Sequence, residues 1–238
     1  MIEFTIDGKK FSAPEGTTIL QAARQHNIYI PTLCHNDSLS DYGACRVCLV
    51  ELRWPKGGGK LVTSCLYPVS EGLDVYTRSE WVLKTRRGVV ELILARSPKS
   101  EPVKKLAAEM GITEPNPRFV QDPDNHCVLC GMCIRACEEV VGVSAINFSG
   151  HGVTRKVCTP FNEANPVCIG CGACSYVCPT NVIKFEDSGS TRKIWEREFQ
   201  MRKCEQCGDS FMPKAQVEFM KKKLNIPDEF FNKCPDCR

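Results

Sequence analysis

Sixteen of the seventeen cysteines in this chain fall into four groups of four, and this spacing constrains the fold more than any other feature of the sequence. Two groups share the spacing C-x2-C-x2-C-x3-C, one group precedes them, and one closes the chain as two separated C-x2-C pairs. Thiolate is a soft ligand that binds iron–sulfur clusters and zinc, and four thiolates complete either kind of site. The sequence therefore predicts a scaffold for metal centres.

A disulfide framework is the other common use of many cysteines, but such frameworks belong to short secreted domains. This chain has 238 residues, and its first residues, MIEFTIDGKKFSA, read as two strands without the apolar core of a signal peptide. No apolar run approaches the roughly 18 residues that a membrane span needs. We therefore expect a reduced setting and a cytoplasmic location.

The net charge does not point to nucleic acid. Thirty-one Lys and Arg against 28 Asp and Glu give a formal charge of +3, which counts every cysteine as neutral. A cluster or a zinc ion with four thiolates carries about −2, so four such sites would bring the total to about −5. The basic run 221–223 adjoins Asp228 and Glu229 on a predicted helix, where a solvated face is expected.

The first 78 residues read as a small β-rich domain. Ile2, Phe4 and Ile6 alternate with polar residues, Asp7-Gly8 forms a turn, and residues 9–13 return as a second strand. Thr17 or Thr18 is expected to cap a short helix through residues 19–23. A loop with three cysteines follows, then strands over 47–52, 61–64 and 73–77, with a glycine turn at 57–59.

This order resembles the β-grasp ferredoxin fold. The spacing C-x10-C-x2-C-x16-C resembles the [2Fe-2S] module at the start of the complex I 75-kDa subunit and its hydrogenase relatives. The resemblance implies one [2Fe-2S] cluster on four residues, Cys34, Cys45, Cys48 and Cys65. Four buried cysteines without a metal are the alternative, since free cysteine is often buried.

Residues 79–118 are predicted to form a helical module. Apolar residues from Trp81 to Leu94 repeat at helical spacing, and the helix should end before Ser97-Pro98. The complex I family has here a pattern like HPLDCPxCDxGGEC, whose His and three Cys hold a [4Fe-4S] cluster. This chain matches both prolines but has other residues at the four ligand positions, Ser97, Glu101, Lys104 and Met110. We expect an ordered helical segment without metal.

Residues 119–188 contain the two identical cysteine runs and resemble a two-cluster ferredoxin. In that arrangement the fourth cysteine of each run binds the other cluster. One [4Fe-4S] cluster is expected on Cys127, Cys130, Cys133 and Cys178, and the second on Cys168, Cys171, Cys174 and Cys137. Gly131, Gly170 and Gly172 are expected to permit the backbone turns of these loops. Cys158 has no partners in the pattern and is expected to be a buried thiol.

Residues 189–238 end in Cys204-x2-Cys207 and Cys234-x2-Cys237, separated by a predicted helix over 213–225. Val217, Met220 and Leu224 are expected to form its apolar face. Isolated C-x2-C pairs with a long intervening segment are typical of zinc ribbons. We expect a zinc-binding knuckle on these four cysteines, and a further iron–sulfur cluster is the alternative.

Together these segments predict an α+β chain with four parts: a β-grasp [2Fe-2S] domain (1–78), a helical segment (79–118), a two-[4Fe-4S] ferredoxin domain (119–188) and a knuckle (189–238). No dinucleotide fingerprint, flavin site or catalytic triad is recognisable, so we expect no active site. The resemblance covers about residues 1–186. It is to the small iron–sulfur subunits of NAD-coupled hydrogenases, formate dehydrogenases and electron-bifurcating flavoprotein complexes.

The resemblance implies electron relay within a hetero-oligomeric NAD(P)-linked oxidoreductase, such as a hydrogenase, a formate dehydrogenase or an electron-bifurcating transhydrogenase. The implied partners are a flavoprotein resembling the complex I 51-kDa subunit and a second redox subunit or soluble ferredoxin. Two other classes remain open: a redox-sensing or assembly protein, and a free multi-cluster ferredoxin. Three centres in series favour relay, because a sensor needs only one exposed cluster.

Overall fold

A computed structural model describes residues 1–238, which divide into two compact units, Met1–Gly131 and Met132–Arg238. Each unit combines helices and strands, as the α+β expectation requires. The dividing point lies inside the first cysteine run, between Cys130 and Cys133. No helix is both long and apolar enough to cross a membrane.

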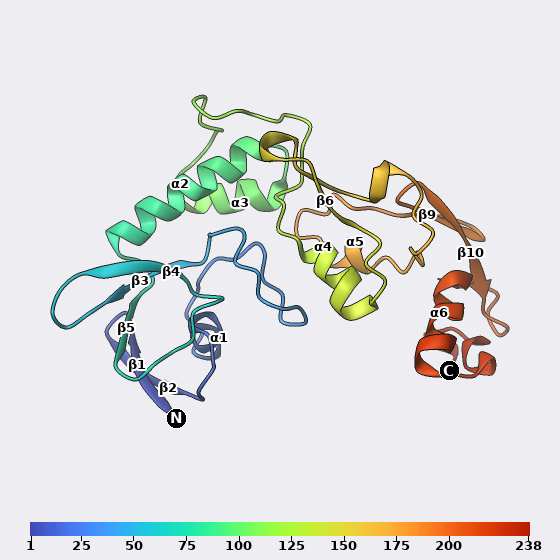
Figure 1. The fold of residues 1–238 in the computed structure, drawn as a ribbon, viewed down its shortest axis with the longest axis horizontal. Coiled ribbons are helices and arrows are strands. Elements are labelled where there is room, and N and C mark those ends of the chain that lie inside the picture. The colour runs from blue at the N-terminus through green and yellow to red at the C-terminus, as the bar shows by residue number, and fades with distance from the viewer. The chain divides into compact units, whose positions relative to one another are not determined.

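The first unit is built on a five-stranded sheet in the order β2-β1-β5-β3-β4 (Figure 1). Its strands are β1 (Ile2–Ile6), β2 (Lys9–Ala13), β3 (Leu49–Arg53), β4 (Gly59–Thr63) and β5 (Leu73–Tyr76). β5 runs parallel to β1 and antiparallel to β3, which places the last strand in the middle of the sheet. β3 and β4 begin two residues away from their expected starts at 47 and 61.

Helix α1 (Ile19–Gln25) closes the core of this sheet, and Thr18 rather than Thr17 caps it. The Thr18 hydroxyl accepts the Gln21 N–H, and the Gln21 side chain accepts the Thr18 N–H, so two free backbone donors are satisfied at once. Asp7 and Gly8 both have positive φ, as a two-residue β1–β2 hairpin requires. The core then joins apolar side chains of α1, β1, β3 and β5 with Cys48 and Cys65.

Helices α2 (Glu80–Arg96) and α3 (Glu101–Glu109) contact each other and complete the first unit (Figure 1). The expected apolar face of α2 is only partly correct. Val82, Val90 and Leu94 are buried, whereas Trp81, Leu83 and Leu92 lie on exposed parts of the helix. The buried stripe follows a spacing of four residues, and the apolar residues that flank it on the helix surface lie outside it.

Ser97–Ser100 form a turn between these helices, so the helical module predicted over 79–118 is interrupted here and resumes at Glu101. Ser97 is buried and its hydroxyl donates to the carbonyl of Cys127, 3.1 Å away. Glu101 and Lys104 form an ion pair of 2.7 Å at the surface. Ser97, Glu101 and Lys104 stand at three of the positions that the resemblance assigns to cluster ligands. In this chain the first makes a hydrogen bond and the other two form an ion pair.

The second unit contains short helices and four antiparallel strand pairings, which form two sheets. Its helical elements are α4 (Met132–Arg135), the π-helical turn η1 (Ala136–Val141), α5 (Ala173–Tyr176) and α6 (Lys214–Leu224). A two-stranded sheet joins β6 (Asn147–Ser149) to β7 (Lys156–Cys158). A four-stranded sheet has the order β11-β10-β9-β8, from strands β8 (Glu186–Ser188), β9 (Thr191–Ile194), β10 (Arg197–Lys203) and β11 (Ser210–Pro213).

Two side chains of the second unit differ from expectation. Val217 of α6 is fully buried, but Leu224 at the end of the same helix is exposed. Cys158 is half-buried rather than buried, and its thiol donates to the hydroxyl of Ser149 on the paired strand. The hydrogen bond to Ser149 on β6 gives this thiol a polar partner, so it can lie near the surface.

Candidate metal centres

The cysteines of the first group form two close pairs, and Cys48 directly precedes β3 while Cys65 follows β4 of the five-stranded sheet. The Sγ atoms of Cys48 and Cys65 lie 3.5 Å apart, and Cys34 forms a hydrogen bond with Cys45. All four side chains are buried. A two-iron cluster bound by four cysteines takes two thiolates on each iron, so this pairing fits a [2Fe-2S] cluster.

Hydrogen bonds between these thiols shift their pKa values strongly. The bond with Cys65 lowers the pKa of Cys48 to about 6, and the same bond raises the pKa of Cys65. The bond with Cys34 likewise raises the pKa of Cys45, and burial adds to that rise. Four thiolates cannot lie this close without positive charge between them, and a metal centre supplies that charge.

The loop that carries three of these cysteines has no regular secondary structure and depends on specific contacts. The His35 ring, next to Cys34, lies within 2.6 Å of Asp41 and 2.9 Å of Asp37 through its two nitrogens. Gly43 and Arg46 both have positive φ, which lets the chain turn sharply around Cys45. The role of His35 was not recognised from the sequence, because its two partners have no characteristic spacing.

Four cysteines of the second unit, which come from both cysteine runs, surround a small cavity. Cys137, from the first run, joins Cys168, Cys171 and Cys174, from the second run, among the residues that line it. Apolar side chains, including Ile146 and Ile194, form the rest of the wall. The chain therefore brings together the four cysteines expected for the second [4Fe-4S] cluster, although 30 residues separate the two runs.

Two N–H groups are directed at thiols of this cavity. The backbone N–H of Ala145 donates to Cys137 Sγ at 3.2 Å, and the indole N–H of Trp195 donates to Cys174 Sγ at 3.3 Å. Burial raises the pKa of Cys174 to about 11, although the Trp195 bond opposes that rise. N–H bonds to cluster sulfurs are one of the main ways in which a protein adjusts a cluster's potential.

Trp195 is placed by the β9–β10 hairpin. Trp195 and Glu196 have φ values of 51° and 57°, as the two central residues of a type I′ turn require. Arg197, directly after the turn, donates to the carbonyls of Asn165, Pro166 and Cys168 at 3.0, 2.6 and 2.7 Å. The hairpin is thereby fastened to the loop that begins the second cysteine run.

The same hairpin explains the two glycines of the second run. Gly170 and Gly172 have φ values of 70° and 79°. A Cβ on Gly170 would lie 2.8 Å from the ring of Phe199 on β10. The predicted need for glycine is confirmed, and close packing of the β10 strand adds a second reason for it at position 170.

The remaining cysteines of the two runs, Cys127, Cys130, Cys133 and Cys178, are divided between the two compact units. Within the first unit, the Leu129 N–H donates to Cys127 Sγ at 3.4 Å. The prediction that these four residues bind a [4Fe-4S] cluster therefore depends on the repeated cysteine spacing in the sequence.

The C-terminal cysteines form the tightest group. The Sγ atoms of Cys204, Cys207, Cys234 and Cys237 all lie within 4.8 Å of one another. A zinc ion with Zn–S bonds of about 2.3 Å holds its four sulfurs about 3.8 Å apart, and the Cys207–Cys234 distance is 3.9 Å. In a four-iron cluster each cysteine binds a different iron, which requires wider spacing. The arrangement fits a single tetrahedral ion.

Backbone donors support a thiolate in this group. The Cys234 N–H donates to Cys204 Sγ at 3.3 Å. Backbone bonds from Cys207 and Cys234 lower the pKa of Cys204 to about 6. The first pair lies in the turn between β10 and β11, and the second lies at the short turn 235–237.

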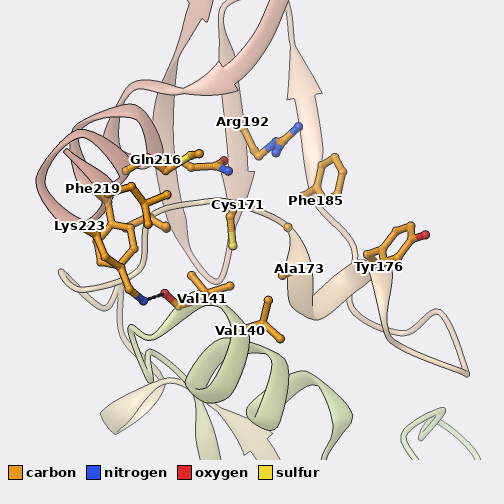
Figure 2. A pocket seen from close by; sticks show the side chains of 14 residues that line it. Val140, Val141, Cys171, Ala173, Tyr176, Phe185, Arg192, Gln216, Phe219 and Lys223 are labelled. Carbon is orange, nitrogen blue, oxygen red and sulfur yellow. Dashed lines mark hydrogen bonds between the residues drawn. The ribbon is translucent and has the colours of Figure 1, made fainter. Parts of the chain in front are cut away.

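An apolar groove of about 640 Å³ opens beside the second-run cavity. Figure 2 shows Phe219 and Lys223 of α6 on one side, Phe185 and Tyr176 on the other, and Cys171 between them. Cys171, Gly172 and Ala173 line both the groove and the cavity. A molecule seated in the groove would therefore be separated from the four-cysteine cavity by a single segment of chain.

Two protein families match separate parts of the chain, and both are families of iron–sulfur domains. Residues 1–80 match the family described as a 2Fe-2S iron-sulfur cluster binding domain. Residues 167–238 match the family described as a 4Fe-4S dicluster domain. This second range contains the second cysteine run and the C-terminal group. The chain therefore contains iron–sulfur domains of both types.

Three similar proteins are named as oxidoreductase subunits. The chain is 34% identical over 207 residues to NADPH-Fe(3+) oxidoreductase subunit alpha of Geobacter sulfurreducens, covering 77% of this chain and 24% of that protein. It is 36% identical over 213 residues to NADP-reducing hydrogenase subunit HndD of Solidesulfovibrio fructosivorans, covering 77% and 36%. It is 30% identical over 220 residues to the mitochondrial NADH-ubiquinone oxidoreductase 78 kDa subunit of Candida albicans, covering 82% and 30%.

A solved structure of an NAD+-reducing [NiFe]-hydrogenase in the H2-reduced state contains a chain with a TM-score of 0.56 and 28% identity to this one. The match covers 66% of this chain and 74% of that chain. The chain spans between about a quarter and about a third of the length of the three relatives named above. The expected resemblance to the complex I subunit and to hydrogenase relatives is confirmed.

Loss of the indole donor is expected to change the second cluster without removing it. Trp195→Phe keeps an aromatic ring on the cavity but deletes the N–H···S bond, so the reduced cluster loses a favourable interaction. We expect its midpoint potential to fall in an EPR-monitored redox titration. Trp54→Phe, which alters an exposed indole in the first unit, is the control. An unchanged potential with a full cluster content in Trp195→Phe would contradict the assigned role.

Proposed function

We propose that this chain, which contains a [2Fe-2S] domain and a 4Fe-4S dicluster domain and resembles iron–sulfur subunits of NAD(P)-linked oxidoreductases, relays electrons inside such a complex. The observation that carries the proposal is the assembly of cysteines into separate groups whose geometry suits metal centres. Bound clusters would supply one-electron chemistry; the chain's own residues hold them, exclude water and set their potentials.

We assign the centres to residues as follows. A [2Fe-2S] cluster is proposed on Cys34, Cys45, Cys48 and Cys65, and [4Fe-4S] clusters on Cys127, Cys130, Cys133, Cys178 and on Cys168, Cys171, Cys174, Cys137. Zinc is proposed on Cys204, Cys207, Cys234 and Cys237, where the short sulfur–sulfur distances support one ion. The knuckle then stabilises the segment around α6 and takes no part in electron transfer.

Metal analysis tests this assignment. Anaerobically purified protein is expected to contain about ten irons, about ten labile sulfides and one zinc per chain. Cys45→Ala should remove about two irons and the [2Fe-2S] EPR signal, because it deletes one of that cluster's four ligands. Cys207→Ala should remove zinc alone, and Cys158→Ala should change neither metal. About fourteen irons with no zinc would instead identify the C-terminal group as a third four-iron cluster.

The partner proposed for electron entry is a flavoprotein resembling the complex I 51-kDa subunit. The similarity to an NADPH-Fe(3+) oxidoreductase subunit and to an NADP-reducing hydrogenase subunit supports a nicotinamide-linked complex. No nucleotide-binding fingerprint is present in this chain, so hydride transfer is assigned to the partner. We propose that this chain is a non-catalytic subunit of a hetero-oligomer.

The decisive experiment isolates the native complex without oxygen and identifies its other chains. We expect a flavoprotein to co-purify and NAD(P)H to reduce the clusters of this chain within the complex but not in the isolated chain. Isolation of the chain alone, with no cluster reduction by NAD(P)H in cell extract, would favour a free ferredoxin or a redox sensor.

The groove beside Cys171 is proposed as the place where an acidic electron carrier such as a soluble ferredoxin exchanges electrons with the second [4Fe-4S] cluster. Arg192 and Lys223 line it, and no acidic residue does. Arg192 is paired with Asp187, whereas the Lys223 ammonium donates only to the carbonyl of Val141. Tyr176, at the rim, is 92% exposed and offers an apolar contact surface.

Reversal of one charge tests this groove. Lys223→Glu should slow ferredoxin-coupled turnover of the complex by about fivefold or more at low salt, because it repels an acidic carrier. Lys222→Glu makes the same change in net charge next to the groove but on a residue that does not line it, and should have a much smaller effect. Equal effects of the two variants would indicate a long-range influence of net charge and no specific groove.

A further inference from the structure

Arg86 is a charged residue on the buried stripe of α2. It stands between Val82 and Val90 at a spacing of four residues, and Leu94 continues the same line. Its exposed fraction is 5%. A buried guanidinium is costly unless an opposite charge or a full set of hydrogen bonds compensates for the loss of water.

The hydrogen bonds of Arg86 provide only partial compensation. One terminal nitrogen donates to the carbonyl of Leu49 at 2.6 Å and to the carbonyl of Thr77 at 3.3 Å. The buried Nε has no hydrogen-bond partner. No carboxylate forms an ion pair with Arg86. The next residue along α2, Arg87, is different, because it pairs with Glu91 at the surface. Both carbonyl acceptors are neutral, so the positive charge is left without a protein counter-charge.

The hydrogen bonds also place the charge beside the first cysteine group. Leu49 directly follows Cys48, and its carbonyl belongs to the first residue of β3. Burial lowers the pKa of Arg86, while Coulomb attraction to Cys48 opposes this effect. Thr77 follows the end of β5, so Arg86 bridges the helical segment to two neighbouring strands of the sheet. The distance between the charge and the cysteines is therefore fixed by the fold.

We propose that Arg86 is the counter-ion of the [2Fe-2S] cluster held by the first cysteine group and that it raises the reduction potential of that cluster. The inference rests on the proposed function. One-electron reduction makes the cluster with its four thiolates more negative by one charge. A fixed cation in a poorly solvated site stabilises the reduced form more than the oxidised form. Arg86 thus acts as a positioning residue that favours electron entry at this centre.

The test is an EPR-monitored redox titration of the [2Fe-2S] signal in the full chain within its complex. Arg86→Gln keeps polar donors but removes the charge, and the midpoint potential should shift downward. Arg86→Lys keeps the charge and should show a smaller shift. Arg87→Gln removes the same formal charge from the adjacent residue, whose side chain is 49% exposed, and should leave the potential unchanged because water screens it.

A cluster in Arg86→Gln with normal iron content and an unchanged potential would overturn the inference. If Arg86→Gln does not incorporate the cluster, the potential of the Arg86→Lys variant distinguishes a charge role from a structural role. A loaded Lys variant with a potential near that of the unaltered chain supports the charge role, whereas a large downward shift, or failure of both variants to load, assigns Arg86 to structural support instead. Absence of any [2Fe-2S] signal in the unaltered chain would refute the proposed cofactor itself.

Discussion

Close approach of buried thiol groups is the constraint on which both units depend. In the first unit four buried cysteines form two close pairs, and in the second unit four cysteines surround one cavity. Ionised thiols at such distances repel one another, and burial makes the charge more costly. A metal centre resolves this conflict, and for that reason metal binding and folding are coupled in proteins of this kind.

Hydrogen-bond donors and cations surround the cysteine groups and offset the negative charge of the thiolates. Trp195 and Ala145 direct N–H groups at two thiols of the second-run cavity. Arg86 brings a full positive charge to the first group, and backbone donors converge on Cys204 in the C-terminal cysteine group. Each device favours negative charge on sulfur. The three groups differ in which device dominates, which offers a physical route to different potentials in one chain.

The segment after α2 is held by polar contacts at positions where the sequence predicts a cluster site without its ligands. Ser97 makes a buried hydrogen bond to the Cys127 carbonyl, and Glu101 pairs with Lys104 on the surface of α3. Helices α2 and α3 contact each other, and each buries a valine, Val90 and Val103, so their apolar packing needs no cluster. A relay assigned to this chain would then rely on the remaining cysteine groups.

The sequence alone determined the cysteine groups, the succession of strands and helix in the first unit and the helices that follow, because these depend on local spacing and on periodicity along the chain. It also narrowed the cap of α1 to two threonines, of which Thr18 is the one used. It did not reveal that β5 lies in the centre of the sheet, that Trp195 reaches Cys174, or that Arg86 is buried beside the first cysteine group. Those features join residues far apart in the chain, and only tertiary packing decides which distant side chains share a poorly solvated site.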